Sequence, residues 1–278
     1  FFWSDKAQLK FGAEVKDLEF VYSAEGFGEN LFESRTKTKE AAAYTKLKYW
    51  PSEKWMIEPG FRLGYYGNSA NKIFYDPRFS TKYLLTDTRY INFSIGKYHQ
   101  FMETIQDDYN PTILDSWLAV DDSVDPAEAQ QAVIGYEEYI RDIYKIQIEA
   151  YYKTIQNMLT FEDSRSSTDA DISDEKVSDA FTLADGYAYG LELFFQKTFG
   201  KLTGWVAYTN SVSRKIMTSQ LTAKEEEYYT NWDRSHVINI LGNYTVNPKW
   251  ELNWKWTWQS GQAFTPILGY YVEKLPGD

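Results

Sequence analysis

Residues 249–260, KWELNWKWTWQS, decide the fold class, because apolar and polar side chains alternate along them without a break. The apolar positions are Trp250, Leu252, Trp254, Trp256 and Trp258. Successive side chains of a strand point to opposite faces, so this two-residue period predicts a strand and not a helix. Four tryptophans on one face are more than a half-buried strand needs, and Trp favours boundaries such as the aromatic girdle of a membrane barrel. We predict that this face contacts lipid.

The composition of the chain is consistent with a membrane barrel. Among 278 residues there are 23 Tyr, 17 Phe and 10 Trp, and 25% of the residues are charged. Mean hydropathy is only −0.53, but a strand with one apolar and one polar face averages to a low value. The sequence contains no run of 18 apolar residues, which excludes a helical membrane span.

Cysteine content and net charge exclude several other classes. The chain has no Cys, which removes disulfide scaffolds, Cys-ligated zinc and thiol chemistry. A net charge of −11 and a pI near 4.8 disfavour nucleic acid as a partner, because phosphate binding needs clustered Lys and Arg. We expect no cofactor.

Ten further segments show the alternation seen in 250–260. Their approximate bounds are 6–22, 39–50, 55–66, 78–85, 90–101, 132–140, 143–161, 184–199, 202–216 and 232–246. The side chains predicted to face lipid include Trp254, Trp256, Leu191, Leu193, Ile146, Ile148, Ile57 and Leu63. Those predicted to face the lumen include Glu192, Gln196, Lys145, Glu149, Lys153, Arg62 and Lys255. The pattern predicts an all-β, antiparallel transmembrane barrel.

Short and long connections alternate between these segments. Short turns are predicted at 51–54, 86–89, 141–142, 200–201 and 247–249, and long polar segments at 23–38, 67–77, 102–131, 162–183 and 217–231. Pro, Gly, Asn and Asp are the expected residues of the short turns. All short turns should therefore lie at one end of the sheet, as the periplasmic turns of outer-membrane barrels do. The helix-like stretch 126–134 is predicted to be a short turn leading into the strand at 132–140.

Several strings in order along the chain resemble the β-barrel domain of TonB-dependent outer-membrane receptors. In the second half they are Gly190-Leu-Glu192, Leu202-Thr-Gly-Trp-Val-Ala-Tyr-Thr-Asn-Ser211, Trp232-Asp-Arg-Ser-His236 and Trp258-Gln-Ser-Gly261, with Lys197 after the first. In the first half they are Leu9-Lys-Phe-Gly-Ala-Glu14, Asp76-Pro-Arg-Phe-Ser80 and Gly96-Lys-Tyr-His-Gln100. The order that these strings share with the family makes the resemblance fairly specific.

The resemblance implies a plugged barrel of about 22 strands, of which residues 1–278 supply about 11–12. It also implies TonB-coupled uptake of a scarce nutrient, such as a chelated metal, a cobalamin or a glycan, across the cell outer membrane. The expected partners are outer-membrane lipid, a plug domain, the remaining barrel strands, TonB and a small-molecule or glycan ligand. The plug, the TonB contact and the terminal strands are expected to lie outside these residues, since the first residues look like a turn entering a strand and the last strand is incomplete.

The ligand is expected to contact the long segment 102–131, because binding residues often sit on loops held by a rigid scaffold. The candidate residues in this segment are Asp107, Asp108, Tyr109, Trp117, Asp121 and Asp122. Loop packing and solubility explain the same residues equally well. Whether the acidic loops bind Ca²⁺ stays open, because none has the EF-hand spacing of carboxylates.

No catalytic or metal site is predicted. Asp233 and His236 are interpreted as a hydrogen-bond cluster at a strand entry, since the chain has only two His and no HExxH motif. Glu137 and Glu138 point to opposite faces of their strand and cannot act on one group. The alternative functions are a passive porin or an adhesin barrel, which would lack a plug, and an enzyme on a barrel rim, for which no His or Ser constellation is present.

Overall fold

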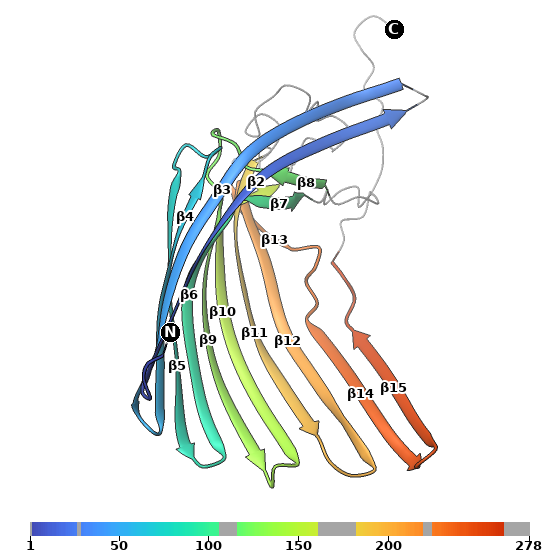
Figure 1. Ribbon diagram of the computed structural model, residues 1–278. Helices are drawn as coiled ribbons and strands as arrows, with labels where there is room; N and C mark the ends of the chain where they lie inside the picture. Colours follow the sequence, from blue (N-terminus) through green and yellow to red (C-terminus); the bar gives the residue numbers. More distant parts are fainter. Residues whose placement is uncertain (1, 27–28, 106–115, 161–181, 219–223, 264–278) are drawn as a thin grey trace, which may run out of the picture.

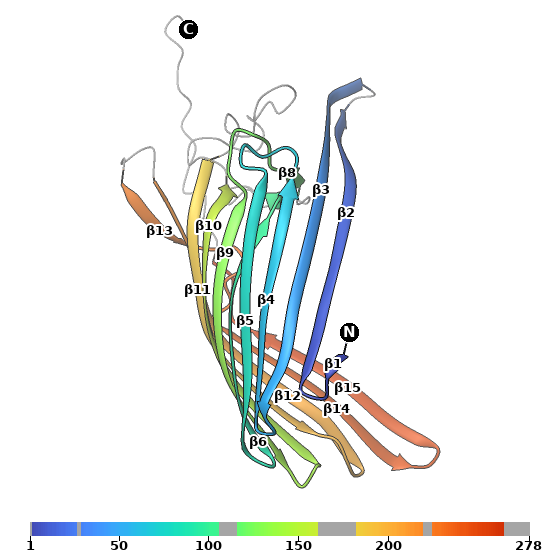
Figure 2. The same ribbon diagram turned by 60° about the vertical axis from the view of Figure 1, so that its left-hand side comes forward.

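The computed structural model describes residues 2–26, 29–105, 116–160, 182–218 and 224–263. One antiparallel sheet dominates these residues, in the spatial order β1-β2-β3-β4-β5-β6-β9-β10-β11-β12-β14-β15. Figures 1 and 2 show that this sheet is strongly curved and that most neighbours in space are also neighbours in sequence. No helix within the described ranges has the length and apolar character needed to span a membrane.

The strands differ widely in length. In chain order they are β1 (Phe2–Ser4), β2 (Ala7–Gly26), β3 (Glu29–Ser52), β4 (Trp55–Tyr66), β5 (Ile73–Thr86), β6 (Arg89–Gln100), β7 (Met102–Ile105), β8 (Ser116–Ala119), β9 (Ala127–Ile140), β10 (Tyr144–Thr160), β11 (Thr182–Lys197), β12 (Leu202–Thr218), β13 (Glu225–Tyr229), β14 (His236–Asn247) and β15 (Trp250–Gln259). β7 and β8 form a separate two-stranded sheet, and β13 pairs with β12 beside the main order. Each of the eleven predicted segments overlaps a strand of the main sheet, so the alternation identified them correctly.

The short turns and the long connections lie at opposite ends of the sheet. The hairpins β3–β4, β5–β6, β9–β10, β11–β12 and β14–β15 close with tight turns at the predicted positions. Figure 1 shows these turns at the lower end and, at the upper end, the strand ends that the long connections join. The predicted asymmetry is confirmed for the described residues.

The prediction of a long polar loop at 23–38 is wrong. β2 and β3 continue as a paired hairpin through this region, from Ala7↔Tyr49 to Gly26↔Glu29. The pairing of β3 with β4 stops at Glu40↔Tyr66, so the far half of the hairpin extends past β4. Residues 33–39 on the β3 side of this half, ESRTKTK, are all polar or charged, which hid the strand from a search for apolar alternation. Figure 1 shows this half curving beyond the other strands.

Three other boundaries also differ from the predictions. β9 begins at Ala127, so residues 126–134 are mostly strand and not a turn. β5 begins at Ile73, which shortens the connection predicted at 67–77. The segments 102–131 and 217–231 contain the short strands β7, β8 and β13. In each case backbone pairing with a neighbouring strand forms a strand that the local sequence pattern does not indicate.

The two faces of the sheet have the predicted polarity. Leu193 pairs with Ile148, and Glu192 pairs with Glu149, so register places the apolar and the charged residues on separate faces. In the interior of the sheet, Ile148 and Leu193 are 39% and 38% exposed, as is expected of side chains that lie against lipid and not against protein. A slip of one residue would exchange the faces and put the charges into hydrocarbon.

Charged side chains pair with one another across the polar face. Arg62 donates from Nη2 to Glu14 Oε1 at 2.9 Å and to Glu40 Oε1 at 3.3 Å, which joins β4 to β2 and β3. Glu137 lies 3.2 Å from both Lys82 and Lys145, joining β9 to β5 and β10. Glu40, Asp76 and Glu137 are buried. Side chains converge on the concave side of a curved sheet, so we assign the polar face to the concave side, the lumen of the barrel.

An aromatic cluster fixes the segment after β6 at the long-connection end. Tyr66 stacks on Phe101 with ring centroids 4.6 Å apart, and Phe74 packs against Phe101 at 5.0 Å. The Tyr66 hydroxyl donates to Val120 O at 2.9 Å, and both residues are fully buried. These contacts place β7 and β8 over the upper ends of β9 and β10 (Figure 1), where a cavity forms.

Candidate functional site

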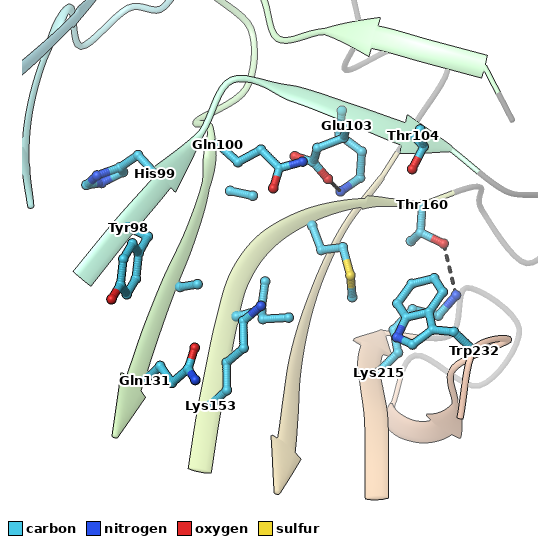
Figure 3. Close-up of a pocket in the computed structure, with 15 residues that line it drawn as sticks. Tyr98, His99, Gln100, Glu103, Thr104, Gln131, Lys153, Thr160, Lys215 and Trp232 are labelled. Carbon is cyan, nitrogen blue, oxygen red and sulfur yellow. Dashed lines mark hydrogen bonds between the residues drawn. The ribbon is translucent and has the colours of Figure 1, made fainter. Parts of the chain in front are cut away.

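A cavity of about 370 Å³ lies at the long-connection end, between β7 and the upper parts of β6, β9, β10 and β12. Its polar lining includes Gln100, Glu103, Gln131, Lys153, Thr160 and Lys215, and its apolar lining includes Ala127, Ala129, Ile155, Met158 and Leu159. Figure 3 shows these side chains around one space, with β7 above and the main sheet below. The volume falls at the low end of the range for small-molecule sites, about 300 to 1,000 Å³.

Glu103 is the buried acid of the cavity, with a 6% exposed side chain. Its Oε2 accepts a hydrogen bond from the Leu159 amide at 2.9 Å, which ties β7 to β10. Oε1 is buried and has no hydrogen-bond partner. Glu103 lies beyond the end of β6, outside the membrane-spanning strands. There, burial raises the pKa of its carboxyl to about 7, although backbone hydrogen bonds from Leu159 and Ala127 act in the opposite direction.

Two lysines bring positive charge to the same cavity. Lys215 is 6% exposed, and its Nζ donates to Thr160 Oγ1 at 3.0 Å. Lys153 reaches upward from β10 toward the space below Glu103 (Figure 3), and no described carboxylate forms an ion pair with it. Trp232, from the connection before β14, closes one side of the cavity with an exposed ring. The site therefore combines an apolar floor with two ammonium groups and one buried carboxyl.

His99 borders the cavity, but both nitrogens of its ring contact carboxylates that lie outside it. Its Nδ1 lies 2.7 Å from Asp76 Oδ1, and its Nε2 lies 3.4 Å from Glu128 Oε2. The His99 ring also packs against Phe74 at 4.9 Å. In Figure 3 the ring points away from Gln100 and Glu103. We assign His99 to the wall that supports the cavity.

The candidate ligand residues predicted in 102–131 do not converge on this cavity in the described part of the chain. Asp121 accepts hydrogen bonds from the amide and the hydroxyl of Ser123, so it stabilises a turn, and Asp122 is an exposed neighbour. Asp107, Asp108 and Tyr109 lie outside the described residues. The backbone of Trp117 belongs to β8, but its side chain is likewise outside what the structure describes.

The interpretation of Asp233 and His236 matches the contacts seen. Asp233 is buried, and its Oδ1 accepts from the Ser213 amide at 2.6 Å. His236 begins β14, and its Nδ1 lies 2.9 Å from the Tyr208 hydroxyl. Among the described residues, no group of three or more His, Asp or Glu is placed to hold a metal ion.

Sequence reasoning missed Glu103, Lys215 and Trp232 as site residues. Glu103 stands in the mainly apolar stretch Phe101-Met-Glu-Thr-Ile105, and a lone acid among apolar residues is a signal of burial that was available. Lys153 was placed correctly on the polar face by the two-residue period. Nothing in the local sequence places Lys215 and Glu103 in one cavity, because this depends on how β7 folds back over the main sheet.

Comparison with protein families gives one match that covers nearly the whole chain. The model described as "TonB dependent receptor-like, beta-barrel" matches residues 5–277. No curated protein matches the sequence. The family match accounts for the short and long connections and for the polar concave face, which are general features of outer-membrane barrels.

Solved structures with a similar fold include an iron transporter, a siderophore receptor and a ferripyoverdine receptor. The FrpB iron transporter from Neisseria meningitidis has a TM-score of 0.63 and 12% identity, covering 91% of this chain and 40% of the other. The siderophore receptor PirA from Acinetobacter baumannii has a TM-score of 0.62 and 13% identity, with 95% and 42% covered. The ferripyoverdine receptor of Pseudomonas aeruginosa has a TM-score of 0.60 and 14% identity, with 84% and 30% covered.

The chain thus spans less than half the length of the structures that it resembles. At 12% to 14% identity these structures establish the fold of the described residues and no more. The assignment of this chain to the family rests on the sequence match, which covers residues 5–277. Residues 1–278 belong to the TonB-dependent receptor β-barrel family, a family of outer-membrane transport receptors and not of enzymes.

Proposed function

We propose that the complete protein takes up a chelated iron across the outer membrane with energy supplied through TonB. The observation that carries the proposal is the family match over residues 5–277, joined by fold similarity to an iron transporter and to siderophore receptors. Cobalamin and glycans are the other ligand classes that the resemblance implied. The three similar structures named above favour iron over both.

We further propose that residues 1–278 form part of the barrel domain, and that a plug domain and further strands come from the rest of the polypeptide. The matched structures are two to three times longer, since the chain covers 30% to 42% of them. Open sheet edges in lipid would leave unpaired backbone groups that cost several kcal/mol each, which favours closure by additional strands.

The geometry is compatible with uptake through the lumen. The polar concave face offers a hydrated path, and the cavity near Glu103 and Lys153 opens at the end that carries the long connections. In outer-membrane barrels the long loops are extracellular. A ligand arriving from outside the cell would therefore meet this cavity before it meets the rest of the lumen.

Growth under iron limitation tests the proposal directly. A strain that lacks the complete protein should fail to grow on at least one ferric chelate from a panel, and the complete protein should restore growth only when TonB is functional. Cobalamin-dependent and glycan-dependent growth serve as the matched comparisons. If the complete protein restores growth without functional TonB, a passive porin is favoured. If the strain that lacks the protein grows normally but no longer attaches to surfaces, an adhesin is favoured.

A further inference from the structure

A row of cationic side chains crosses the polar face where β2, β3, β4 and β5 lie side by side (Figures 1 and 2). Register pairs Lys10 with Lys46, Lys46 with Gly60, and Gly60 with Arg78. The two lysines are directly opposite each other, with Cβ atoms about 4.5 to 5.5 Å apart, and like charges in such a pair destabilise a sheet. An anion between them would stabilise this part of the wall.

A third lysine joins this pair to form the lysine patch, which consists of Lys10, Lys46 and Lys48. In the β2–β3 register Lys48 is the diagonal neighbour of Lys10, about 7 to 8 Å away. One carboxylate lies among the three lysines, since Glu58 Oε1 is 3.0 Å from Lys46 Nζ. Lys48 Nζ lies over the Trp50 ring at 5.2 Å from its centroid. Among the described residues no carboxylate pairs with Lys10 or Lys48, so two positive charges of the patch lack a counter-charge.

Two adjoining cavities lie at the lysine patch on the lumen side. Their volumes are about 500 Å³ and about 220 Å³, and Lys10, Lys46 and Glu58 line both of them. The larger cavity extends along the row to Arg78. Gly60, which stands between Lys46 and Arg78 in the row, has no side chain and leaves this space open. The wall is therefore hollowed at the place where its positive charges are uncompensated.

The neighbouring arginines already have carboxylate partners within the sheet. Arg62 Nη2 lies 2.9 Å from Glu14 Oε1 and 3.3 Å from Glu40 Oε1, and Arg78 Nη2 lies 3.5 Å from Asp76 Oδ2. The surplus of positive charge is thus confined to the lysine patch, in a chain whose net charge is −11. A local patch of opposite sign to the rest of the chain indicates a partner that carries negative charge.

We propose that the lysine patch is a docking surface for the plug domain, and that an Asp or Glu side chain of the plug lies between Lys10 and Lys48. The inference rests on the proposed function, which assigns a plug to the polypeptide outside residues 1–278. The similar structures are two to three times longer, so the complete chain has room for such a domain. Because the patch faces the lumen, its partner comes from inside the barrel. A carboxylate accepts charge-assisted hydrogen bonds from two ammonium groups at once, which makes it the fitting counterpart.

Zero-length cross-linking of the purified full-length protein in a non-ionic detergent tests the proposal. A water-soluble carbodiimide activates carboxylates, and a lysine amine in direct contact displaces the activating group and forms an amide bond. Mass spectrometry of the digested protein then identifies the carboxylate that each lysine contacts. We expect Lys10 or Lys48 to be joined to an Asp or Glu of the plug domain.

Other lysines of the sheet provide matched controls in the same experiment. Lys46 Nζ and Lys82 Nζ lie 3.0 Å and 3.2 Å from the carboxylates of Glu58 and Glu137, so both should give cross-links within residues 1–278. Lys201 is exposed in the turn between β11 and β12 and should give no cross-link to the plug.

A double variant shows whether the lysines hold the plug carboxylate or only lie near it. In Lys10→Gln/Lys48→Gln, the plug carboxylate identified in the native protein should react with added glycinamide and carbodiimide about tenfold faster, because hydrogen bonds to a charged group are lost. The double variant Lys54→Gln/Lys201→Gln, which removes two lysines at the short turns, should leave this rate unchanged.

Three results would overturn the proposal. The first is the absence of any cross-link from Lys10 and Lys48 while the control cross-links of Lys46 and Lys82 form. The second is a partner carboxylate within residues 1–278 or in a neighbouring barrel strand, which would show that the wall balances its own charge. The third is an equal rate of glycinamide reaction in the native protein and in Lys10→Gln/Lys48→Gln.

The cross-linking result and the growth result are independent of each other. If the growth experiment above fails but the cross-link to the plug forms, the chelated iron is rejected and the docking surface is kept. If growth on a ferric chelate depends on the protein and on TonB but the cross-link does not form, the docking surface alone is rejected.

Discussion

The two ends of the sheet are held by different kinds of interaction. At the short-turn end the backbone conformation is decisive: Arg141 and Asp142 have φ angles of 54° and 56°, and Gly204 has a φ of 147°. At the long-connection end, side chains hold backbone groups far away in sequence, as Tyr66 holds Val120 and Glu103 holds Leu159. The short-turn end is thus encoded locally, whereas the other end depends on contacts that the completed sheet brings together.

The largest effect is expected from Gly204→Ala at the short-turn end. A Cβ at this position would overlap the carbonyl oxygen of Leu241, which is backbone and cannot move without breaking the β12–β14 pairing. The φ of 147° adds strain for any residue with a side chain. We expect a loss of about 4 kcal/mol in unfolding free energy, or failure to fold, measured by urea titration of the full-length protein in lipid vesicles.

Gly261→Ala is the matched control for this change. A Cβ added at Gly261 meets nothing within 4 Å, so the same substitution should leave the unfolding free energy nearly unchanged. Equal stability of the two variants would contradict the view that backbone geometry fixes the short-turn end.

The second effect concerns the stretch between the two ends, where lipid on one face and water on the other determine which side chains are tolerated. Leu193 lies on the apolar face of β11, and Leu193→Arg should cost roughly 2 to 4 kcal/mol if the residue lies near the midplane of the membrane. Gln196→Arg, on the polar face of the same strand, should cost much less. The two unfolding free energies are compared in the same vesicles, and a loss below about half the expected value would argue against the assigned faces.

A smaller and more local effect is expected at the long-connection end. Tyr66→Phe removes the donor to Val120 O and leaves a buried acceptor unpaired, at a cost of about 1 to 3 kcal/mol. The loss should appear as faster amide hydrogen exchange in β7 and β8, with unchanged exchange at the short turns. Tyr65→Phe, with an exposed ring on the other face, is the control. Faster exchange throughout the sheet would show that the two ends are not independent.

The smallest effect is a gain in stability at the β9–β10 turn. Asp142 adopts a positive φ that glycine tolerates better, so Asp142→Gly should stabilise the turn by up to about 1 kcal/mol. The midpoint of urea unfolding is the measurement. Asp87→Gly, in the β5–β6 turn where no positive φ occurs, should bring no gain. A destabilised Asp142→Gly variant would mean that the side chain matters more than the backbone there.

The sequence predicted the membrane-spanning part of the fold well, because lipid on one face and water on the other impose a strict period. Leu191 and Leu193 alternate with Glu192 for this reason. The period fails at 23–38, where the hairpin of β2 and β3 runs past β4. Residues 33–39 of β3 have no apolar side chain, and this part of the strand is identified by its backbone pairing with β2.

The candidate site was predicted much less completely. The period placed Lys153 on the lumen face, but Glu103 and Lys215 line the same cavity only because of how β7, β10 and β12 are arranged in space. Local sequence contains no information about that order. Asp121 and Asp122 were predicted to contact the ligand, but Asp121 accepts a hydrogen bond from the Ser123 amide and stabilises a turn.

The hairpin of β2 and β3 behaves mechanically as a cantilever. From Glu29 to Lys39, its outer part has a reach of about 34 Å at 3.4 Å per residue, and among the described residues it is paired only with β2. At Glu40 the pairing with β4 begins, and the amide of Gly67 donates to Lys39 O at 2.9 Å, so the stiffness rises abruptly there. We expect a force on the outer part of the hairpin to bend it mainly at this junction, because fewer backbone hydrogen bonds hold it beyond Glu40.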